Sequence, residues 1–339
     1  MRVADFIIDR LVKKHGIKVI PLLTGNGSLV INDAICKNKD VLAICVHHEQ
    51  DAGYFALGHS KYTNKLSVVN PTTGCACTNC ITPLLAAYQD HVPVIFLSGN
   101  VALNQTSRFY KSKFCDIKKL GVQELDIIEI VWPITKYAVM LTDKKQAKRE
   151  LDKAASIALT PPFGPVWVDI PADIGASIIS EEELEEYVPF PVQIEKMEKA
   201  FDSLLLSLEQ SQKPLILVGQ GIKLSDSREE FQKMIEKLQI PVVTTFGGSD
   251  LLDHNNPLNL GVIGIKGVRA SDLALQNCDF LLCMGCCLNT PEIGYDPQKF
   301  APQARKAIID LDARNSGQRL NFNDIIECDL KDFLRYAIK

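Results

Sequence analysis

The stretch VLAICVHHEQDAGYFALGHS, residues 41–60, places an apolar run directly before a polar cluster and a segment rich in Ala and Gly. Residues 41–46 lack polar alternation, which is typical of a strand buried in a parallel sheet with both faces covered. Residues 51–62 are expected to form a helix. A buried strand that leads into a helix is the repeating unit of α/β folds, and it predicts that fold class here.

The same pattern extends in both directions along the chain. In the first half we expect strands at residues 19–23, 66–70, 92–97 and 166–170, and helices at residues 4–15 and 78–88. In the second half we expect helices at residues 195–209, 228–238 and 270–275, and strands at residues 214–218, 241–245, 280–284 and 306–311. The sequence therefore predicts two doubly wound, parallel-sheet, Rossmann-like domains.

Charge and proline content indicate where the two domains separate. A glutamate-rich run between residues 181 and 186 precedes Pro189 and Pro191, and it offers little to bury. We therefore expect domains at residues 1–175 and 196–339, with residues 176–195 as a solvated linker.

Composition excludes several classes of protein. The chain has 339 residues, a net charge of -4 and an isoelectric point of about 5.9, which argues against nucleic-acid binding through a basic surface. Its apolar runs are shorter than the roughly 18 residues of a membrane span. Its 11 cysteines occur without export signals. We therefore expect reduced thiols in a cytoplasmic protein that binds neither nucleic acid nor membrane.

The densest polar cluster is His47-His48-Glu49-Gln50, at the end of the predicted strand. Open α/β sheets bind ligands at that edge. A carboxyl group between Val46 and Ala52 would be partly desolvated and suited to proton exchange. The alternative is structural, because Glu49 at a helix N-terminus would simply favour the helix dipole.

A turn of small residues, TTGCACTN at residues 72–79, follows the third predicted strand. Small residues allow a flat ring to approach the backbone, although the segment is equally compatible with an ordinary strand-to-helix turn. Cys75, Cys77 and Cys80 lie here, and a second group of cysteines lies at residues 283–287. The two groups fall in different predicted domains, so we predict no metal site.

One glycine-rich turn lies in the second domain. Gly219-Gln220-Gly221 follows a predicted strand, but no third glycine stands three residues on. The turn alone is a weak signal for dinucleotide binding.

Five segments succeed one another in the first half: residues 46–53 (VHHEQDAG), 72–79 (TTGCACTN), 90–99 (DHVPVIFLSG), 121–136 (GVQELDIIEIVWPITK) and 164–171 (GPVWVDIP). In this order they resemble motifs of the thiamine-diphosphate enzymes of the acetolactate synthase type. Residues 213–221, 241–244 and 309–312 are similar to that family's central domain. The sequence of residues 121–136 is similar to that of family members from unusual-sugar and polysaccharide metabolism.

This resemblance implies a function for specific residues. Residues 1–175 would bind the pyrimidine ring of thiamine diphosphate, and Glu49 would hydrogen-bond that ring and favour its imino tautomer. Gly25, Thr73, Gly74 and Asn79 would contribute to the cofactor pocket, and Gln123 would face the substrate. The implied reaction is decarboxylation of a 2-keto acid and transfer of the resulting two-carbon unit.

The sequence also departs from the family. Cys75 and Ala76 replace a Pro-Gly pair, and Cys287 stands where flavin-binding relatives have Arg, so FAD is not expected. Relatives continue into a domain whose G-D-G…N-N motif binds Mg²⁺ and the diphosphate, and this sequence contains no Gly-Asp-Gly. We therefore expect Mg²⁺ only together with a diphosphate-binding domain absent from this sequence, which a separate chain or a further part of the same protein would carry. A homo-oligomer, dimer or tetramer, is also implied.

Two alternatives stay open from the sequence. The chain would be a non-catalytic scaffold or regulatory homologue if the diphosphate domain has no counterpart. It would be a flavin- or nucleotide-binding protein if only the central domain binds a ligand. The presence of Glu49, which a scaffold does not need, favours the enzyme.

Overall fold

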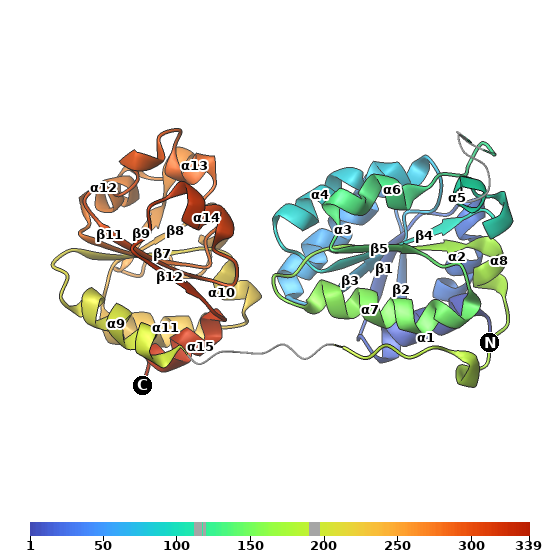
Figure 1. Ribbon diagram of the computed structural model, residues 1–339, viewed down its shortest axis with the longest axis horizontal. Coiled ribbons are helices and arrows are strands. Elements are labelled where there is room, and N and C mark those ends of the chain that lie inside the picture. The colour runs from blue at the N-terminus through green and yellow to red at the C-terminus, as the bar shows by residue number, and fades with distance from the viewer. Residues whose placement is uncertain (112–116, 118–119, 190–196) are drawn as a thin grey trace. The chain divides into compact units, whose positions relative to one another are not determined.

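The computed structural model describes residues 1–111, 117, 120–189 and 197–339 (Figure 1). Internal contacts divide the chain into two compact units, Met1–Pro191 (unit 1) and Val192–Lys339 (unit 2). Each unit is a parallel sheet between helices, so the predicted α/β class with two doubly wound domains is confirmed.

The described part of unit 1 contains six parallel strands. They are β1 (Val19–Leu22), β2 (Leu42–Cys45), β3 (Ser67–Val69), β4 (Val94–Asn100), β5 (Tyr137–Met140) and β6 (Val166–Pro171). Strands β1 and β2 form one pair, and the remaining four follow the order β3-β4-β6-β5. Asn70 joins the two groups, because its backbone bonds to Pro21 O (3.0 Å) and Leu23 N (3.1 Å). The resulting order across the unit is β2-β1-β3-β4-β6-β5.

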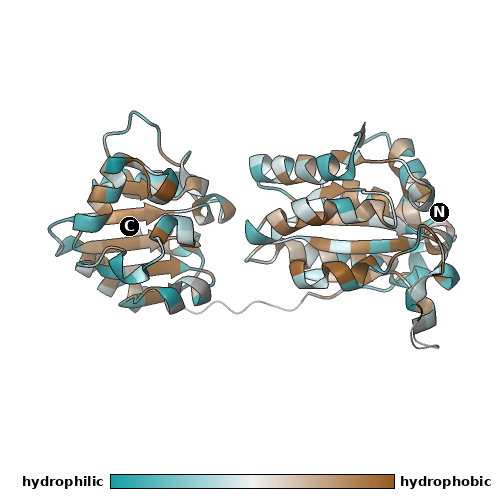
Figure 2. Cartoon of the chain, turned by 90° about the horizontal axis from the view of Figure 1, so that it is seen from above, coloured by the Kyte–Doolittle hydropathy of each residue, from teal (hydrophilic) through white to brown (hydrophobic). Residues whose placement is uncertain are grey.

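Helices cover both faces of this sheet. They are α1 (Val3–Lys13), α2 (Leu29–Lys37), α3 (Glu49–Thr63), α4 (Ile81–Gln89), α5 (Ser107–Lys111), α6 (Ile127–Val131), α7 (Ala147–Leu159) and α8 (Ala172–Ala176). α1, α2 and α7 pack on one apolar core, and α3, α4 and α6 pack on a second core on the opposite face. Figure 2 shows apolar strands between helices whose outer faces are polar. The burial of both sheet faces explains the absence of polar alternation in most strands.

Two expectations for unit 1 need correction. Strand β2 is an edge strand, and Leu42 and Cys45 on it are exposed rather than buried. The expected linker is partly structured, because Ile179 and Leu184 are buried in the core beside α1 and α7. The prediction of a linker rested on the glutamate content of this segment, so it did not anticipate that two apolar residues would anchor the segment to the core. Residues 190–195 of the expected linker, and residue 196 after it, lie outside the described residues.

Unit 2 has strands in the order β12-β11-β10-β7-β8-β9, all parallel. Their bounds are β7 (Pro214–Val218), β8 (Val242–Thr244), β9 (Asn259–Val262), β10 (Phe280–Met284), β11 (Arg305–Asp310) and β12 (Asp324–Glu327). Counted from β7, this is the 3-2-1-4-5-6 order of a dinucleotide-binding sheet. The chain adds strands on one side of β7 up to β9 and then on the other side from β10, so strand order reverses between β7 and β10.

The helices of unit 2 also lie on two faces. They are α9 (Glu198–Glu209), α10 (Gly221–Leu224), α11 (Arg228–Leu238), α12 (Arg269–Asn277), α13 (Thr290–Ile293), α14 (Arg314–Arg319) and α15 (Leu330–Ala337). α9, α11 and α15 cover one core, and α12 packs on the other. At the reversal, a Cβ added to Gly219 would lie 2.2 Å from Gly285 O, and one added to Gly221 would lie 2.5 Å from Gly285 Cα. The glycines of this turn therefore admit a neighbouring loop.

Within the described part of the chain, every helix is too short or too polar to traverse a lipid bilayer.

Candidate functional site

The candidate site lies at the carboxyl edge of the sheet in unit 1. The chain passes from β1 outward to β2 and then returns to β3 on the other side of β1. The loops that follow β1 and β3 therefore begin side by side, at the point where strand order reverses. This is where open α/β sheets bind ligands.

These two loops are in direct contact. A Cβ added to Gly25, in the loop after β1, would lie 1.8 Å from Thr72 Oγ1 in the loop after β3. A Cβ added to Gly27 would lie 2.4 Å from Thr73 Cγ2. The structure thus places the predicted residues Gly25 and Thr73 in adjoining loops, and it requires that the first loop carry no side chain at these points.

Thr72 is a residue that the sequence did not single out as a site residue. Its φ of +66° is unusual for a β-branched side chain, and such strain persists where surrounding structure demands it. The hydroxyl groups of Thr72 and Thr73 are both buried and, within the described residues, without a hydrogen-bond partner. Buried polar atoms ordinarily find partners, so this pair marks a place where a ligand can supply them.

Glu49 is the first residue of α3, directly beyond β2, and it is only 8% exposed. Asn79 donates from Nδ2 to Glu49 Oε2 at 2.9 Å, and the Cys80 thiol donates to Glu49 O at 3.0 Å. Both residues belong to a short 3-10 helix, η2 (Ala76–Cys80), which packs against α3. The structure therefore brings the predicted residues Glu49 and Asn79 together, and Glu49 stands at a helix N-terminus as well.

Gly74 and Gln123, predicted from distant segments, also meet. Gly74 has φ +63°, and a Cβ added there would lie 2.1 Å from Gln123 O. The Cys77 thiol donates to Gly74 O at 2.8 Å and ties this turn to η2. Gln123 itself is exposed at the rim of the loop that precedes α6.

A buried polar network beneath this rim escaped the sequence prediction. Asp169, within β6, accepts hydrogen bonds from Ser98 Oγ (2.5 Å) and Asn100 Nδ2 (2.8 Å), and Trp167 Nε1 donates to Ser98 Oγ (2.8 Å). Complete burial raises the pKa of Asp169 to about 7, although both hydrogen bonds oppose that rise. Asn100 also donates to Leu125 O at 3.2 Å, which links the network to the segment that carries Gln123. In the sequence Asp169 is surrounded by apolar residues, so nothing there indicated its hydrogen-bond partners.

The cysteines near the site are buried thiols that donate hydrogen bonds. Burial raises the pKa of Cys77 and of Cys80 far above the usual range, so both thiols stay protonated at neutral pH. Across the described residues, no three His, Cys, Asp or Glu side chains are grouped to hold a metal ion.

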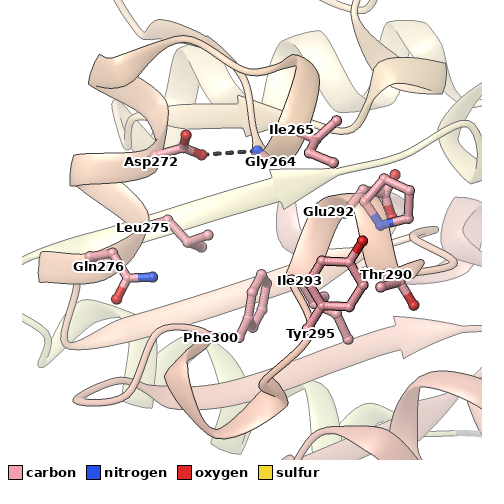
Figure 3. Close-up of a pocket in the computed structure, with 12 residues that line it drawn as sticks. Gly264, Ile265, Asp272, Leu275, Gln276, Thr290, Glu292, Ile293, Tyr295 and Phe300 are labelled. Atoms are coloured by element: carbon pink, nitrogen blue, oxygen red, sulfur yellow. Dashed lines mark hydrogen bonds between the residues drawn. The ribbon is translucent and has the colours of Figure 1, made fainter.

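Unit 2 has a pocket of about 640 Å³ between η8 (Gly264–Lys266), α12 and α13 (Figure 3). Its wall is mainly apolar, with Leu275, Ile293 and Phe300 among the lining residues. Asp272 accepts a hydrogen bond from Gly264 N at 2.9 Å, and this bond holds η8 to α12. Burial raises the pKa of Glu292 on the opposite wall.

Two family models match the two units separately. The thiamine pyrophosphate enzyme N-terminal TPP binding domain matches residues 1–130, and the thiamine pyrophosphate enzyme central domain matches residues 201–336. The chain belongs to the thiamine pyrophosphate enzyme family. Its family assignment agrees with the resemblance found in the sequence motifs.

Members of this thiamine pyrophosphate enzyme family are similar along nearly the whole chain. A probable acetolactate synthase large subunit of Methanocaldococcus jannaschii is 31% identical over 99% of this chain and 55% of its own length. The acetolactate synthase large subunit of Lactococcus lactis is 32% identical over 96% of this chain and 55% of its own length. Acetolactate synthase isozyme 1 large subunit of Escherichia coli is 27% identical over 99% of this chain and 57% of its own length. The chain thus spans about half the length of the curated relatives that it matches.

Proposed function

We propose that unit 1 is the pyrimidine-binding half of a thiamine-diphosphate site, and that the complete enzyme decarboxylates a 2-keto acid and transfers the two-carbon unit to an acceptor. The observation that carries this proposal is the buried carboxyl group of Glu49, held by Asn79 at the edge where strand order reverses. A buried carboxyl group to which, among the described residues, a single side chain donates is suited to share a proton with a ligand. Such a group has no evident use in a scaffold.

The residues present fit the aminopyrimidine end of this cofactor. Thr72 and Thr73 offer buried hydroxyl groups that lack partners among the described residues, and the missing side chains of Gly25 and Gly74 let Thr72 and the Gln123 backbone approach closely. Thiamine diphosphate, when bound, supplies the carbanion chemistry of the reaction. The chain's own part is to orient the ring and to hold the proton that the Glu49 carboxyl group shares with it. Gln123, which is exposed in the loop before α6, is the residue that we propose faces the substrate.

A second part of the site must hold the diphosphate. Relatives matched here are roughly twice as long as this chain, and the three named above are described as large subunits. We assign Mg²⁺ and diphosphate binding to a domain outside these 339 residues, in another chain or another segment. In the same way, a dimer or tetramer is the assembly that would complete the site.

The state of the cysteines bears on the location that we propose for the protein. None of the ten cysteines that the structure describes forms a disulfide, which is typical of a reducing compartment and supports a cytoplasmic location. We retain the prediction of a role in unusual-sugar or polysaccharide metabolism as the finer alternative to acetolactate formation. That unit 2 holds no FAD is likewise still a prediction.

The test is reconstitution. Neighbouring reading frames are searched for Gly-Asp-Gly followed by Asn-Asn, and the encoded chain is mixed with this one, thiamine diphosphate, Mg²⁺ and a series of 2-keto acids. We expect carbon dioxide release that depends on both chains and on the cofactor. Release that the second chain gives alone would contradict the proposal.

A further inference from the structure

Glu49 is contacted twice from a single short element. Asn79 Nδ2 donates to Oε2 of its carboxyl group at 2.9 Å, and Cys80 Sγ donates to its backbone oxygen at 3.0 Å. The two donors are consecutive residues of η2, so side chain and backbone of Glu49 are both fixed by one turn. Two independent contacts restrict the carboxyl group more than either does alone.

The turn that supplies these donors is itself secured. Cys77 Sγ donates to Gly74 O at 2.8 Å, and Thr78 Oγ1 donates to Cys75 O at 2.6 Å. η2 also packs against both α3 and α4. Since η2 is bonded to the turn before it and packs against α3 and α4, the position of Asn79 relative to α3 is set by the fold and not only by its own hydrogen bond.

We infer that Asn79 is a positioning residue that decides which oxygen of Glu49 exchanges a proton with the ligand. An amide nitrogen donates only, so Oε2 must act as an acceptor. The exchangeable proton of the carboxyl group then resides on Oε1, which has no hydrogen-bond partner in the described part of the chain. This inference rests on the proposed function and refines it.

The neighbouring titratable groups do not compete for this role. Cys80 stays protonated because burial raises its pKa, and it bonds to the backbone. His48 precedes Glu49 and accepts a hydrogen bond from Gln50 N at Nδ1, while Asp51 lies one residue beyond on α3 and is exposed. Cys77 bonds to Gly74. Asn79 is therefore the described side chain that donates to the carboxylate.

The experiment is a carbon-13 NMR titration, with thiamine diphosphate, of the full chain labelled at the glutamate carboxyl carbon. The Glu49 resonance is identified by its loss in Glu49→Gln. In Asn79→Ala both carboxyl oxygens lack this donor, so neither is selected, and the change that the cofactor causes in the Glu49 chemical shift should fall by about half. Asn79→Gln, which retains an amide, should recover part of that change.

Cys75→Ala is the matched control, because Cys75 directly precedes η2 and its exposed side chain makes no capping hydrogen bond. It should leave the cofactor-induced change unaltered. An unaltered change in Asn79→Ala, or an equal reduction in Cys75→Ala, would overturn the inference. Failure of the proposed function is seen separately, as turnover that survives Glu49→Gln in the reconstituted enzyme.

Discussion

Gly74 and Gln123 are in backbone contact so close that a Cβ on Gly74 would lie 2.1 Å from the carbonyl oxygen of Gln123. Gly74 also has φ +63°, a conformation that other residues adopt only at a cost. The contact joins the turn after β3 to the loop before α6 across the mouth of the site. The contact therefore holds the two loops together and fixes the position of the Gln123 backbone.

Gly74→Ala should lower the free energy of unfolding of unit 1 by about 1–3 kcal/mol, because it adds both backbone strain and a steric conflict. The measurement is urea unfolding. Gly58→Ala on α3 is the control, since no heavy atom lies within 4 Å of its added Cβ. There the change should be neutral or slightly stabilising, by up to about 1 kcal/mol. Equal losses of unfolding free energy in both variants would show that the close contact with Gln123 does not account for the destabilisation.

Glu49→Gln should leave the fold intact and reduce turnover of the reconstituted enzyme by at least about 100-fold, because a primary amide cannot exchange the proton. Decarboxylation of the 2-keto acid is followed by carbon dioxide release, and thermal unfolding of the variant provides the control. Turnover close to the unmodified level would remove Glu49 from the mechanism.

Asp169 predicts a pH dependence of stability. Its pKa of about 7 in the folded chain lies above the value of 3.8 expected when unfolded. Between these values the folded state keeps a proton that the unfolded state loses, so the free energy of unfolding should fall as pH rises from about 4 to about 7. Above that range the loss is complete.

Tryptophan fluorescence measures this dependence selectively, because Trp132 and Trp167 both lie in unit 1. Asp169→Asn should flatten the profile between about pH 4 and about pH 7. Asp152 does not interfere, since Arg10 and Lys14 help to hold its pKa well below the usual range and its contribution is lost only at lower pH. An unchanged profile in the variant would show that Asp169 is ionised throughout.

Thiol reactivity should divide the cysteines of the 72–80 segment. Cys75 is exposed, whereas Cys77 and Cys80 are buried and have raised pKa values. Thiolate is the reactive form, so iodoacetamide should label Cys75 in the folded chain and the other two only after denaturation. Peptide mass spectrometry reads out each site. Rapid labelling of Cys80 would contradict its contact with Glu49 O.

The sequence predicted the fold class because apolar strands and amphipathic helices alternate regularly. It made Glu49 a candidate because a polar cluster follows an apolar strand, and the role of Glu49 stays a prediction. It could not place Leu42 and Cys45 on an exposed edge, since strand order depends on distant pairing. The role of Cys80 was equally hidden, because a thiol that donates to a backbone oxygen has no signature in the sequence.

Glu49 also shows why the two interpretations of the polar cluster could not be separated from the sequence. It is the first residue of α3, as the structural alternative required, and its carboxyl group is also buried against Asn79. A helix dipole explains the first fact but does not require the second. Only the three-dimensional position of η2 distinguishes them.

The most direct test of the central claim is a nitrogen-15 NMR titration of the chain with thiamine diphosphate, with and without Mg²⁺. The account predicts shift changes at the amides of Gly25, Glu49 and Gly74 that do not depend on Mg²⁺, because this chain contacts only the pyrimidine end. Changes confined to unit 2 around Gly219 and Gly221, or none at millimolar cofactor, would contradict it.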